Sequence, residues 1–290
     1  MSTTPDNFLG LPAKDADYAN ARFAILPIPY DATTSFGVGT REGPRAIITA
    51  SQQVELYDEE LGKETITTGV ATLDPLAPDS RGPKEMHERI FNAAKKIVKD
   101  GKFLFGLGGE HSVSSGLIRA VATKHKNLSV LQIDAHADLR DEYQGSPYSH
   151  ASIMHRVHDM GIPAVGVGIR NYSKPEAAFA KKNKLPLFSV RDVRTRANWI
   201  DEVISHLTNA VFVTIDIDGF DPAYAPGTGT PEPGGLDWFQ VNDLLAAVAK
   251  QKQIVAADIV EVRPLPPSTV TEFLAARLAH RLMGLVVENG

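Results

Sequence analysis

Short apolar runs alternate with longer amphipathic segments along most of the chain. The runs are apolar on both faces, as in strands buried inside a parallel sheet, and residues 128–133 are the clearest example. Between the runs, apolar residues recur at helical spacing. We predict strands over residues 23–29, 65–73 (an edge strand), 103–107, 128–133, 163–169, 211–215 and 254–262, and helices over 44–54, 83–99, 114–121, 150–160, 239–250 and 269–285, with short strand and helix signals over 185–190 and 199–207.

This alternation predicts the fold class. Strands that alternate with helices favour an α/β fold, in which a mainly parallel sheet carries helices on both faces. The chain contains no internal repeat and no linker of disordered composition. We therefore expect residues 1–290 to form a single domain, in which residues 1–20 are a loosely held N-terminal arm.

Composition narrows the class of protein and of partner. The chain has 290 residues, of which 43% are hydrophobic and 22% charged, as in ordinary globular proteins. Its net charge of -5 argues against a nucleic-acid partner, and no apolar run is long enough to predict a membrane span. The N-terminus has no signal-peptide pattern, so we expect a cytoplasmic protein. Cysteine is absent, which leaves His and carboxylate side chains as ligands for a metal.

Ligand-type side chains follow three of the predicted strands. Asp134, His136 and Asp138 come directly after residues 128–133, and an extended backbone would aim all three to one side. Each residue alone has an ordinary structural explanation, such as an Asx turn or a structural histidine. Because ligands collect at the carboxyl ends of parallel strands, we expect the whole set to meet there. The other members of the set are His111, Asp216 and Asp218.

The charge of this set predicts how many ions it binds. Four carboxylates and two neutral imidazoles carry a charge of about -4, which two divalent cations neutralise and one does not. Oxygen-rich ligands favour Mn²⁺ over Zn²⁺. Two such ions hold a bridging water, lower its pKa and present hydroxide as a nucleophile. The sequence therefore predicts metal-assisted hydrolysis at a site with two Mn²⁺ ions.

Several motifs also carry a family resemblance. The sequence resembles the ureohydrolases, the family of arginases and agmatinases, and is most similar to the agmatinases. The motifs are Gly108-Gly-Glu-His-Ser112, the segment 134–138, Ser149-His150, and the long segment 216–235. The resemblance implies an arginase-like three-layer α/β/α fold, trimers or hexamers, and hydrolysis of a guanidino group to urea and an amine. It also implies that His111, Asp134, Asp138 and Asp216 bind the manganese ions, and that His136 and Asp218 complete the pair.

The resemblance extends to residues that would act on the substrate. His150 corresponds to a histidine that shuttles a proton to the leaving amine, a role that suits an imidazole because its pKa lies near neutrality. Glu261 follows the last strand, where its carboxylate would grip a planar guanidinium through two parallel hydrogen bonds. The ordinary alternatives are a local hydrogen bond for His150, and for Glu261 an ion pair with Arg263 or another arginine. Asp138 would accept a hydrogen bond from the hydroxide.

The loop over residues 139–148 is expected to select the substrate tail. Glu142 or Asp141 would attract the amine of agmatine, whereas Arg140 would either attract a carboxylate tail or pair with Asp141. The chain departs from many relatives in having Glu110 in place of Asp, and Ala-Ser in place of Gly-Thr after His150. Neither change removes a predicted ligand.

The expected reaction is hydrolysis of agmatine, a small cationic guanidino compound, to urea and putrescine. Other guanidino or formimino compounds stay open as substrates, namely guanidinobutyrate, arginine, formiminoglutamate and guanidine, as does a catalytically idle relative. The remaining histidines are expected at the surface, with His155 and His158 on a solvated helix face instead of in a second metal site; the others are His87, His125, His206 and His280.

Overall fold

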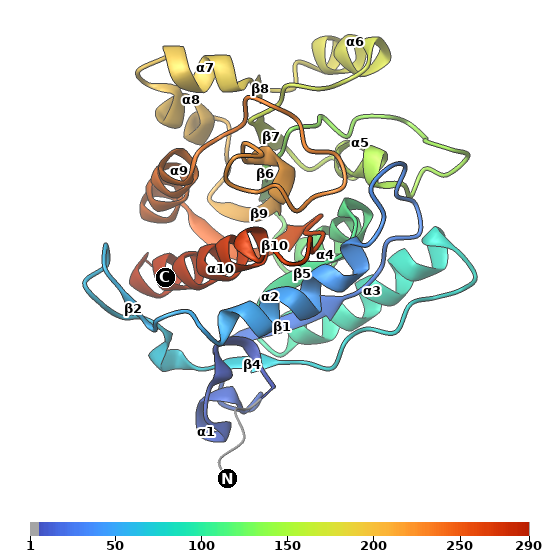
Figure 1. Ribbon diagram of the computed structural model, residues 1–290. Helices are drawn as coiled ribbons and strands as arrows, with labels where there is room; N and C mark the ends of the chain where they lie inside the picture. The colour runs from blue at the N-terminus through green and yellow to red at the C-terminus, as the bar shows by residue number, and fades with distance from the viewer. Residues whose placement is uncertain (1–5, 290) are drawn as a thin grey trace.

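The computed structural model describes residues 6–289, and its centre is one parallel sheet. Eight strands lie in the order β4-β1-β5-β10-β9-β6-β7-β8, with every neighbouring pair parallel (Figure 1). The strands are β1 (Phe23–Ile28), β4 (Val70–Thr72), β5 (Phe103–Gly108), β6 (Leu128–Ile133), β7 (Ala164–Val167), β8 (Leu187–Phe188), β9 (Ala210–Asp216) and β10 (Gln253–Val260); a separate antiparallel pair is β2 (Tyr57–Asp58) and β3 (Lys63–Glu64).

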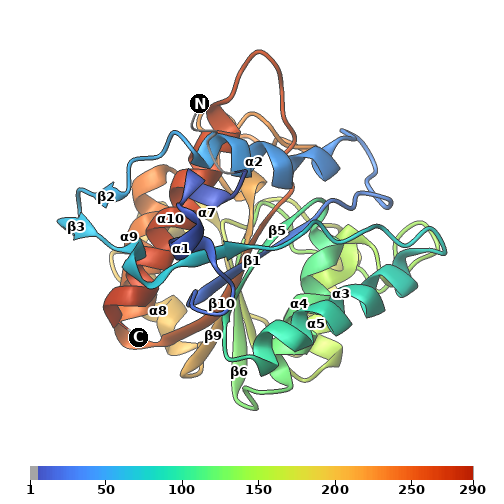
Figure 2. The same cartoon turned by 90° about the horizontal axis from the view of Figure 1, so that it is seen from below.

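Helices cover both faces of the sheet, as Figure 2 shows. One layer contains α2 (Gly43–Ser51), α8 (Trp199–Ser205), α9 (Trp238–Gln251) and α10 (Val270–Asn289). The opposite layer contains α3 (Pro83–Lys99), α4 (Ser114–Ala122) and α5 (Ile153–Asp159). The remaining helices are α1 (Ala13–Ala16), α6 (Lys174–Asn183) and α7 (Val190–Thr195). The predicted three-layer α/β/α fold is confirmed.

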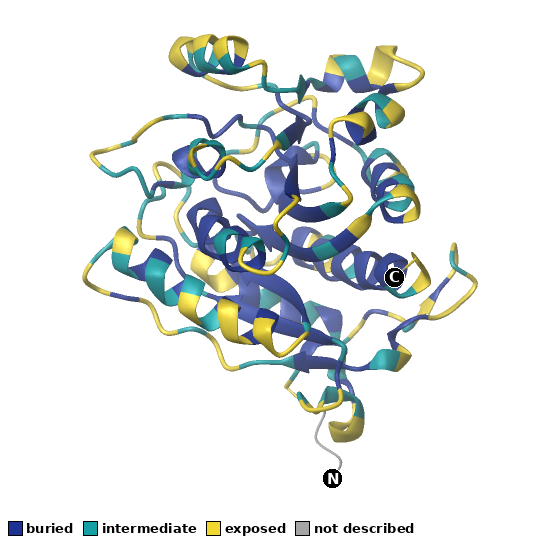
Figure 3. Cartoon of the chain, turned by 180° about the vertical axis from the view of Figure 1, so that it is seen from behind, coloured by how far each residue is buried: buried dark blue, intermediate teal, exposed yellow. Residues whose placement is uncertain are grey.

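The two faces of the sheet bury two separate hydrophobic clusters. Neighbouring residues of a strand point to opposite faces, so that Leu104 of β5 lies in the cluster beneath α3 and α4, while Phe105 lies in the one beneath α2 and α10. Every residue of β5, β6 and β1 is buried (Figure 3). Burial on both faces is why these strands have no alternating polar pattern. Within residues 6–289, no helix combines the length and the apolar character that crossing a membrane requires.

Some predicted boundaries differ from the structure. The edge strand is confirmed but covers only Val70–Thr72, because residues 66–68 form a 3₁₀ turn. Helix α6 was not predicted, since its sequence, KPEAAFAKKN, buries only Glu176 and Ala180 and therefore has a narrow apolar face. Its start is stabilised by a capping box between Ser173 and Glu176.

Two predictions about exposure are wrong in the described residues. Phe8, Leu9 and Leu11 of the expected N-terminal arm are buried in the core, so this part of the arm is not loosely held; residues 1–5 lie outside the described range. His87 and His280 are buried as well, and burial lowers the pKa of each to about 4. Both lie on helix faces that pack inward, because their helices α3 and α10 are covered by neighbouring elements.

Candidate metal centre

The predicted ligands meet at one edge of the sheet. Strands β5, β10, β9 and β6 are neighbours at its centre, and because they are parallel their carboxyl ends lie side by side. All the predicted site residues apart from those on loop 139–150 follow directly from these four ends: His111 after β5, Glu261 after β10, Asp216 and Asp218 at the end of β9, and Asp134, His136 and Asp138 after β6.

The ligand atoms form two groups that share one carboxylate. His111, Asp134 and Asp216 offer atoms that lie within 4.8 Å of one another, and so do Asp134, His136 and Asp218. In the second group, His136 Nδ1 lies 3.0 Å from Asp218 Oδ2 and 3.7 Å from Asp134 Oδ1. Asp134 is therefore common to both groups.

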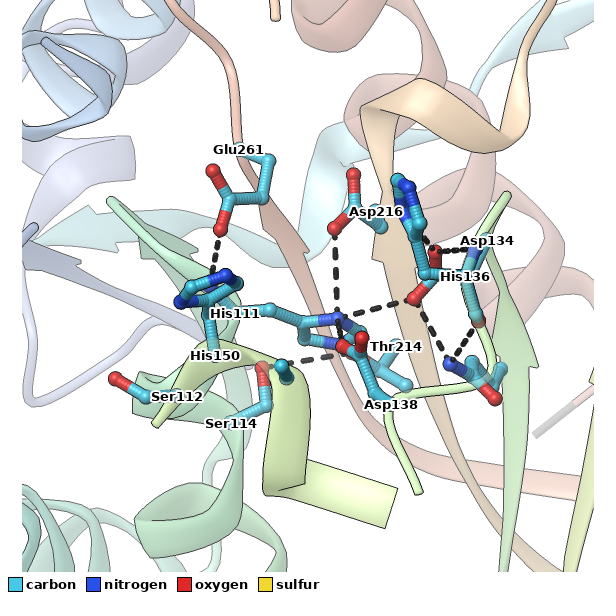
Figure 4. Close-up of polar contacts among 12 residues, drawn as sticks. His111, Ser112, Ser114, Asp134, His136, Asp138, His150, Thr214, Asp216 and Glu261 are labelled. Atoms are coloured by element: carbon cyan, nitrogen blue, oxygen red, sulfur yellow. Dashed lines mark hydrogen bonds and ion pairs between the residues drawn. The ribbon is translucent and has the colours of Figure 1, made fainter. Parts of the chain in front are cut away.

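His111 lies at the centre of the carboxylates (Figure 4). Its Nδ1 is 3.1 Å from Asp134 Oδ2, 3.0 Å from Asp138 Oδ2 and 3.4 Å from Asp216 Oδ2. This nitrogen is buried and has no hydrogen-bond partner among the described residues. A ring nitrogen surrounded by three carboxylate oxygens matches the ligand set of a divalent cation.

The buried negative charge of the cluster also favours a bound cation. Burial, together with the charges of Asp138 and Asp218, raises the pKa of Asp134 to about 7. Burial and the neighbouring carboxylates likewise raise the pKa of Asp216 well above its ordinary value. Carboxylates that are buried together destabilise one another unless a positive charge compensates them. The residues present therefore fit metal ions.

A hydrogen-bonded chain behind the site orients His111. Its Nε2 lies 2.9 Å from Thr214 Oγ1, and the Thr214 hydroxyl donates to Asp258 Oδ1 at 2.7 Å. Because the Thr214 hydroxyl uses its only proton in the hydrogen bond to Asp258, its oxygen can only accept a hydrogen bond from His111. The N–H of His111 is therefore at Nε2. Nδ1 then keeps a free electron pair for a metal, as is usual for histidine ligands.

Thr214 and Asp258 belong to a polar row across three strands that the sequence analysis missed. Gln132 of β6 pairs in register with Thr214 of β9, and Thr214 pairs with Asp258 of β10. The Gln132 amide donates to Asp134 Oδ2 at 2.8 Å and to the His136 carbonyl at 3.1 Å. The available signal was a polar residue inside each apolar strand, two positions before Asp134 and two before Asp216.

Glu261 lies against His111 without a cationic partner. Its Oε1 accepts a hydrogen bond from the backbone N–H of His111 at 2.8 Å, and burial raises the pKa of its carboxyl well above the ordinary value. Within residues 6–289 no arginine makes an ion pair with it, and Arg263 donates instead to the Val38 carbonyl at 2.9 Å. Glu261 and Asp138 both have positive φ, 62° and 50°. Such backbone strain is common at functional sites.

His150 is placed at the same pocket by the loop after β6. Its backbone N–H donates to Thr33 Oγ1 at 3.1 Å, and its Nδ1 lies 3.3 Å from the same oxygen. Burial lowers the pKa of His150, and the charge of Asp138 opposes this shift. The local hydrogen bond considered as the ordinary alternative is also present, since Ser149 Oγ lies 3.4 Å from Nδ1.

The pocket above these residues is a cavity of about 240 Å³. Arg140 and Tyr143 of the 139–148 loop line it, and the Arg140 guanidinium lies 4.8 Å from the centre of the Tyr143 ring. Glu142 is not among the described residues that line it. Asp141 pairs with Arg156 at 3.0 Å and not with Arg140. Of the three charged loop residues, Arg140 is therefore the one at the pocket wall.

The pocket wall opposite this loop comes from the long segment 216–235. Arg170 holds this segment by donating to the backbone carbonyls of Asp218 at 2.8 Å and Glu232 at 2.6 Å. Thr230 donates to Asp218 Oδ2 at 3.3 Å. The loop is thereby tied to the ligand-bearing end of β9.

His155 and His158 pack against a neighbouring helix. Both pack against the ring of Phe179 on α6, with ring centres 4.2 Å and 5.1 Å away. The prediction that they lie on a solvated helix face is wrong, because this face is half-buried. The reason is the unpredicted helix α6, which covers them.

Comparison with known proteins identifies the family. The model of the arginase family matches residues 21–284. The chain belongs to the arginase family. It is 40% identical to an N(1)-aminopropylagmatine ureohydrolase from Synechocystis over 92% of this chain and 90% of that protein.

Solved structures agree with this family. The agmatine ureohydrolase of Thermoplasma volcanium has 31% identity and a TM-score of 0.87 over 98% of this chain and 95% of that one. Proclavaminate amidino hydrolase from Streptomyces clavuligerus has 26% identity and a TM-score of 0.91 over 99% of both chains. The protein is thus an agmatinase-like ureohydrolase whose His and Asp side chains can hold metal.

Proposed function

We propose that this protein hydrolyses the guanidino group of agmatine to urea and putrescine with two Mn²⁺ ions. The observation that carries the proposal is the pair of ligand groups sharing Asp134, which opens into a pocket with an unpaired carboxylate, Glu261. Similarity to the agmatine ureohydrolase of Thermoplasma volcanium supports agmatine as the substrate. His111, Asp134 and Asp216 would hold one ion, and Asp134, His136 and Asp218 the other, with Asp138 beside His111 as a further ligand.

The bound metal would supply a water of lowered pKa. The protein's own residues would do the rest. Glu261 keeps one carboxylate oxygen free of His111, and this carboxylate would bind and orient the guanidinium. Asp138 would accept a hydrogen bond from the attacking water. The water oxygen bonds to the guanidinium carbon, and the bond from that carbon to the alkylamine nitrogen breaks.

His150 would complete the reaction by proton transfer. The leaving amine needs a proton, and an imidazole at the pocket wall can take one from water and pass it on. The pKa of His150 is lowered by burial, which keeps the ring neutral and able to accept that proton near neutral pH. We propose His150, Glu261 and Asp138 as the catalytic residues.

N(1)-aminopropylagmatine is a second candidate substrate. The relative from Synechocystis that bears this name is 40% identical over most of both chains. This compound has the same guanidino group with a longer tail that carries an additional amine. The metal centre, Glu261 and His150 would therefore act on both compounds in the same way. The two compounds would differ only in the residues that their tails contact at the outer wall of the pocket.

Steady-state kinetics on a substrate panel, with metal content measured on the same sample, would test the proposal. Urea release is expected to be fastest from agmatine and to require about two Mn²⁺ per chain. Faster release from N(1)-aminopropylagmatine would select the second candidate, and faster release from guanidinobutyrate would indicate that Arg140 recognises a carboxylate tail. No release from any member, including arginine, formiminoglutamate and guanidine, would overturn the proposal.

The tail contacts need their own variant. Glu142 was predicted to attract the amine of agmatine, and the Glu142→Gln variant tests this through the KM for agmatine. A raised KM supports the prediction, and an unchanged KM contradicts it. We further propose from the family resemblance that the protein acts in the cytoplasm. We also propose that it forms a trimer or hexamer, and light scattering of the purified protein would check this oligomeric state.

A further inference from the structure

A second hydrogen-bonded chain connects a buried carboxylate to His150. Glu110 is fully buried and accepts a hydrogen bond from the Thr33 hydroxyl at 2.6 Å. The same hydroxyl oxygen lies 3.3 Å from His150 Nδ1 and 3.1 Å from the backbone nitrogen of His150. Three residues from distant parts of the sequence are thus joined through one threonine oxygen.

The number of protons in this chain determines the state of the imidazole. The Thr33 hydroxyl has one proton to donate. It donates this proton in its shortest hydrogen bond, the one to Glu110 Oε1. The hydroxyl oxygen can then only accept hydrogen bonds from His150. The backbone N–H supplies one, so Nδ1 must carry a proton to supply the other. Nε2 is left as the basic nitrogen of the ring.

Glu110 is built to hold the threonine in this orientation. Its second oxygen accepts the backbone N–H of Thr33 at 2.6 Å, and its first oxygen also accepts the Ser112 hydroxyl at 2.5 Å. The Glu110 backbone is fixed as well, by its N–H donating to the Tyr30 carbonyl at 2.8 Å. Three donors converge on this carboxylate, so it acts as an acceptor. The Thr33 hydroxyl therefore points its proton at Glu110 and not at His150.

Among residues 6–289, Ser149 offers Nδ1 a second and slightly longer contact. Ser149 Oγ lies 3.4 Å away, and because that hydroxyl accepts the backbone N–H of Ala151, its own proton is free to point at Nδ1. It is a longer contact from a neighbouring residue and has no buried carboxylate behind it. The geometry therefore favours Thr33 as the partner of Nδ1.

We propose that Glu110 and Thr33 are positioning residues that hold His150 as the tautomer with its proton on Nδ1 and its basic Nε2 available for proton transfer. The importance of this tautomer rests on the proposed function, in which His150 moves a proton to the leaving amine. A carboxylate that orients a catalytic histidine through its other ring nitrogen is a known way of fixing a tautomer. Here the threonine hydroxyl stands between the two groups.

The tautomer can be measured without any turnover. ¹⁵N chemical shifts of histidine-labelled protein distinguish a ring protonated on Nδ1 from one protonated on Nε2, and the His150→Asn variant assigns the signal. The protein is loaded with diamagnetic Zn²⁺ for this measurement, because paramagnetic Mn²⁺ would broaden signals from the same pocket. We expect His150 to be protonated on Nδ1 in the unmodified protein and in Thr33→Ser, which keeps the hydroxyl. In Thr33→Val, which keeps the shape, we expect a mixture of tautomers or the Nε2 form.

Steady-state kinetics distinguish a positioning role of Thr33 from a general loss of folding. Thr33→Val is expected to lower kcat for agmatine by about 10-fold to 100-fold, a part of what a general acid or base contributes, with KM and metal content little changed. Thr33→Ser should recover most of the kcat. Thr49→Val removes a hydroxyl from the exposed face of α2 and serves as the matched control with unchanged kcat.

Each outcome bears on one proposal. An unmodified protein with His150 protonated on Nε2, or a Thr33→Val variant with unchanged tautomer, would overturn the positioning role even if agmatine is hydrolysed. A Thr33→Val variant that loses metal and melting temperature in proportion to kcat, with no change in tautomer, would also overturn it. Failure of the unmodified protein to release urea while the tautomer responds as expected would instead count against the proposed function.

Discussion

At the scale of single residues, the site depends on side chains that never touch a metal or a substrate. Thr214 and Asp258 fix which nitrogen of His111 is free, and Gln132 holds Asp134 from behind. Asp258 is buried, and burial raises its pKa to about 6. A buried carboxylate with a raised pKa is costly, so its presence behind a ligand histidine indicates a positioning role.

The first prediction concerns this support of His111. Thr214→Val keeps the shape of the side chain but leaves Nε2 of His111 without its acceptor. We expect the affinity for Mn²⁺ to fall by about 10-fold to 100-fold, as measured by titration of the metal-free protein. Thr195→Val, which removes an exposed hydroxyl from α7, should leave the affinity unchanged. Equal affinities of the two variants would contradict the role of Thr214.

The second prediction concerns Glu261. Glu261→Gln keeps an acceptor for the His111 backbone N–H but removes the charge that would pair with a guanidinium. We expect kcat/KM for agmatine to fall by about 30-fold or more, corresponding to a loss of about 2 kcal/mol, while metal content is unchanged. Glu202→Gln on α8, far from the pocket, is the control. A variant that kept kcat/KM would show that the guanidinium is bound elsewhere.

At the scale of elements, packing between helices gives some histidines a structural role. His280 of α10 is fully buried, and burial, together with the charge of Arg277, lowers its pKa to about 4. A neutral buried imidazole must leave the core or become charged there as the pH falls. The unfolded chain, whose histidines titrate near their ordinary pKa, binds that proton more readily.

The third prediction follows from this difference. Between about pH 6.5 and pH 4 the unfolded state binds more protons at His280 than the folded state does, so stability is complete above about pH 6.5 and is lost as the pH falls. His280→Leu should therefore show a smaller loss of unfolding free energy between pH 7 and pH 5 in urea titrations. His206→Leu at the exposed end of α8 is the control. If the unfolding free energy fell by the same amount with pH in the His280→Leu variant and in the unmodified protein, the prediction would be refuted.

At the scale of the whole molecule, four central strands bring one acidic cluster together. The ends of β6 and β9 contribute the four carboxylates of the candidate ligand set, while β5 contributes His111 and β10 contributes Glu261, and all of them lie at a single buried edge. Without cations these groups repel one another across the strands that form the core. The stability of the fold and the occupancy of the metal centre should therefore be coupled.

The fourth prediction tests that coupling. Dialysis against a chelator should abolish urea release and lower the melting temperature, and Mn²⁺ should restore both. Calorimetry of the stripped and reloaded protein measures the change, with Mg²⁺ as a control ion that matches the charge but binds this ligand set less well. A fully demetallated protein that still released urea would be incompatible with the proposed mechanism.

The sequence by itself determined most of the helices and strands and which side chains are candidate ligands. Apolar runs such as residues 128–133 predict buried strands because burial on both faces requires them, and a ligand pattern such as Asp134, His136 and Asp138 is local to one strand end. The parallel arrangement followed from the alternation of strands and helices, which places all the strand ends at one edge. The central features of the candidate site were therefore predictable before any contact was known.

Only the tertiary structure decided the rest. Register across strands places Gln132, Thr214 and Asp258 in one row, and register depends on pairings between residues far apart in the chain. The Thr33 and Glu110 partners of His150, and the cover that α6 gives to His155, likewise arise from packing. The candidate ligands lie at the ends of the strands that carry them, whereas Thr214 and Asp258, which orient His111, come from two other strands.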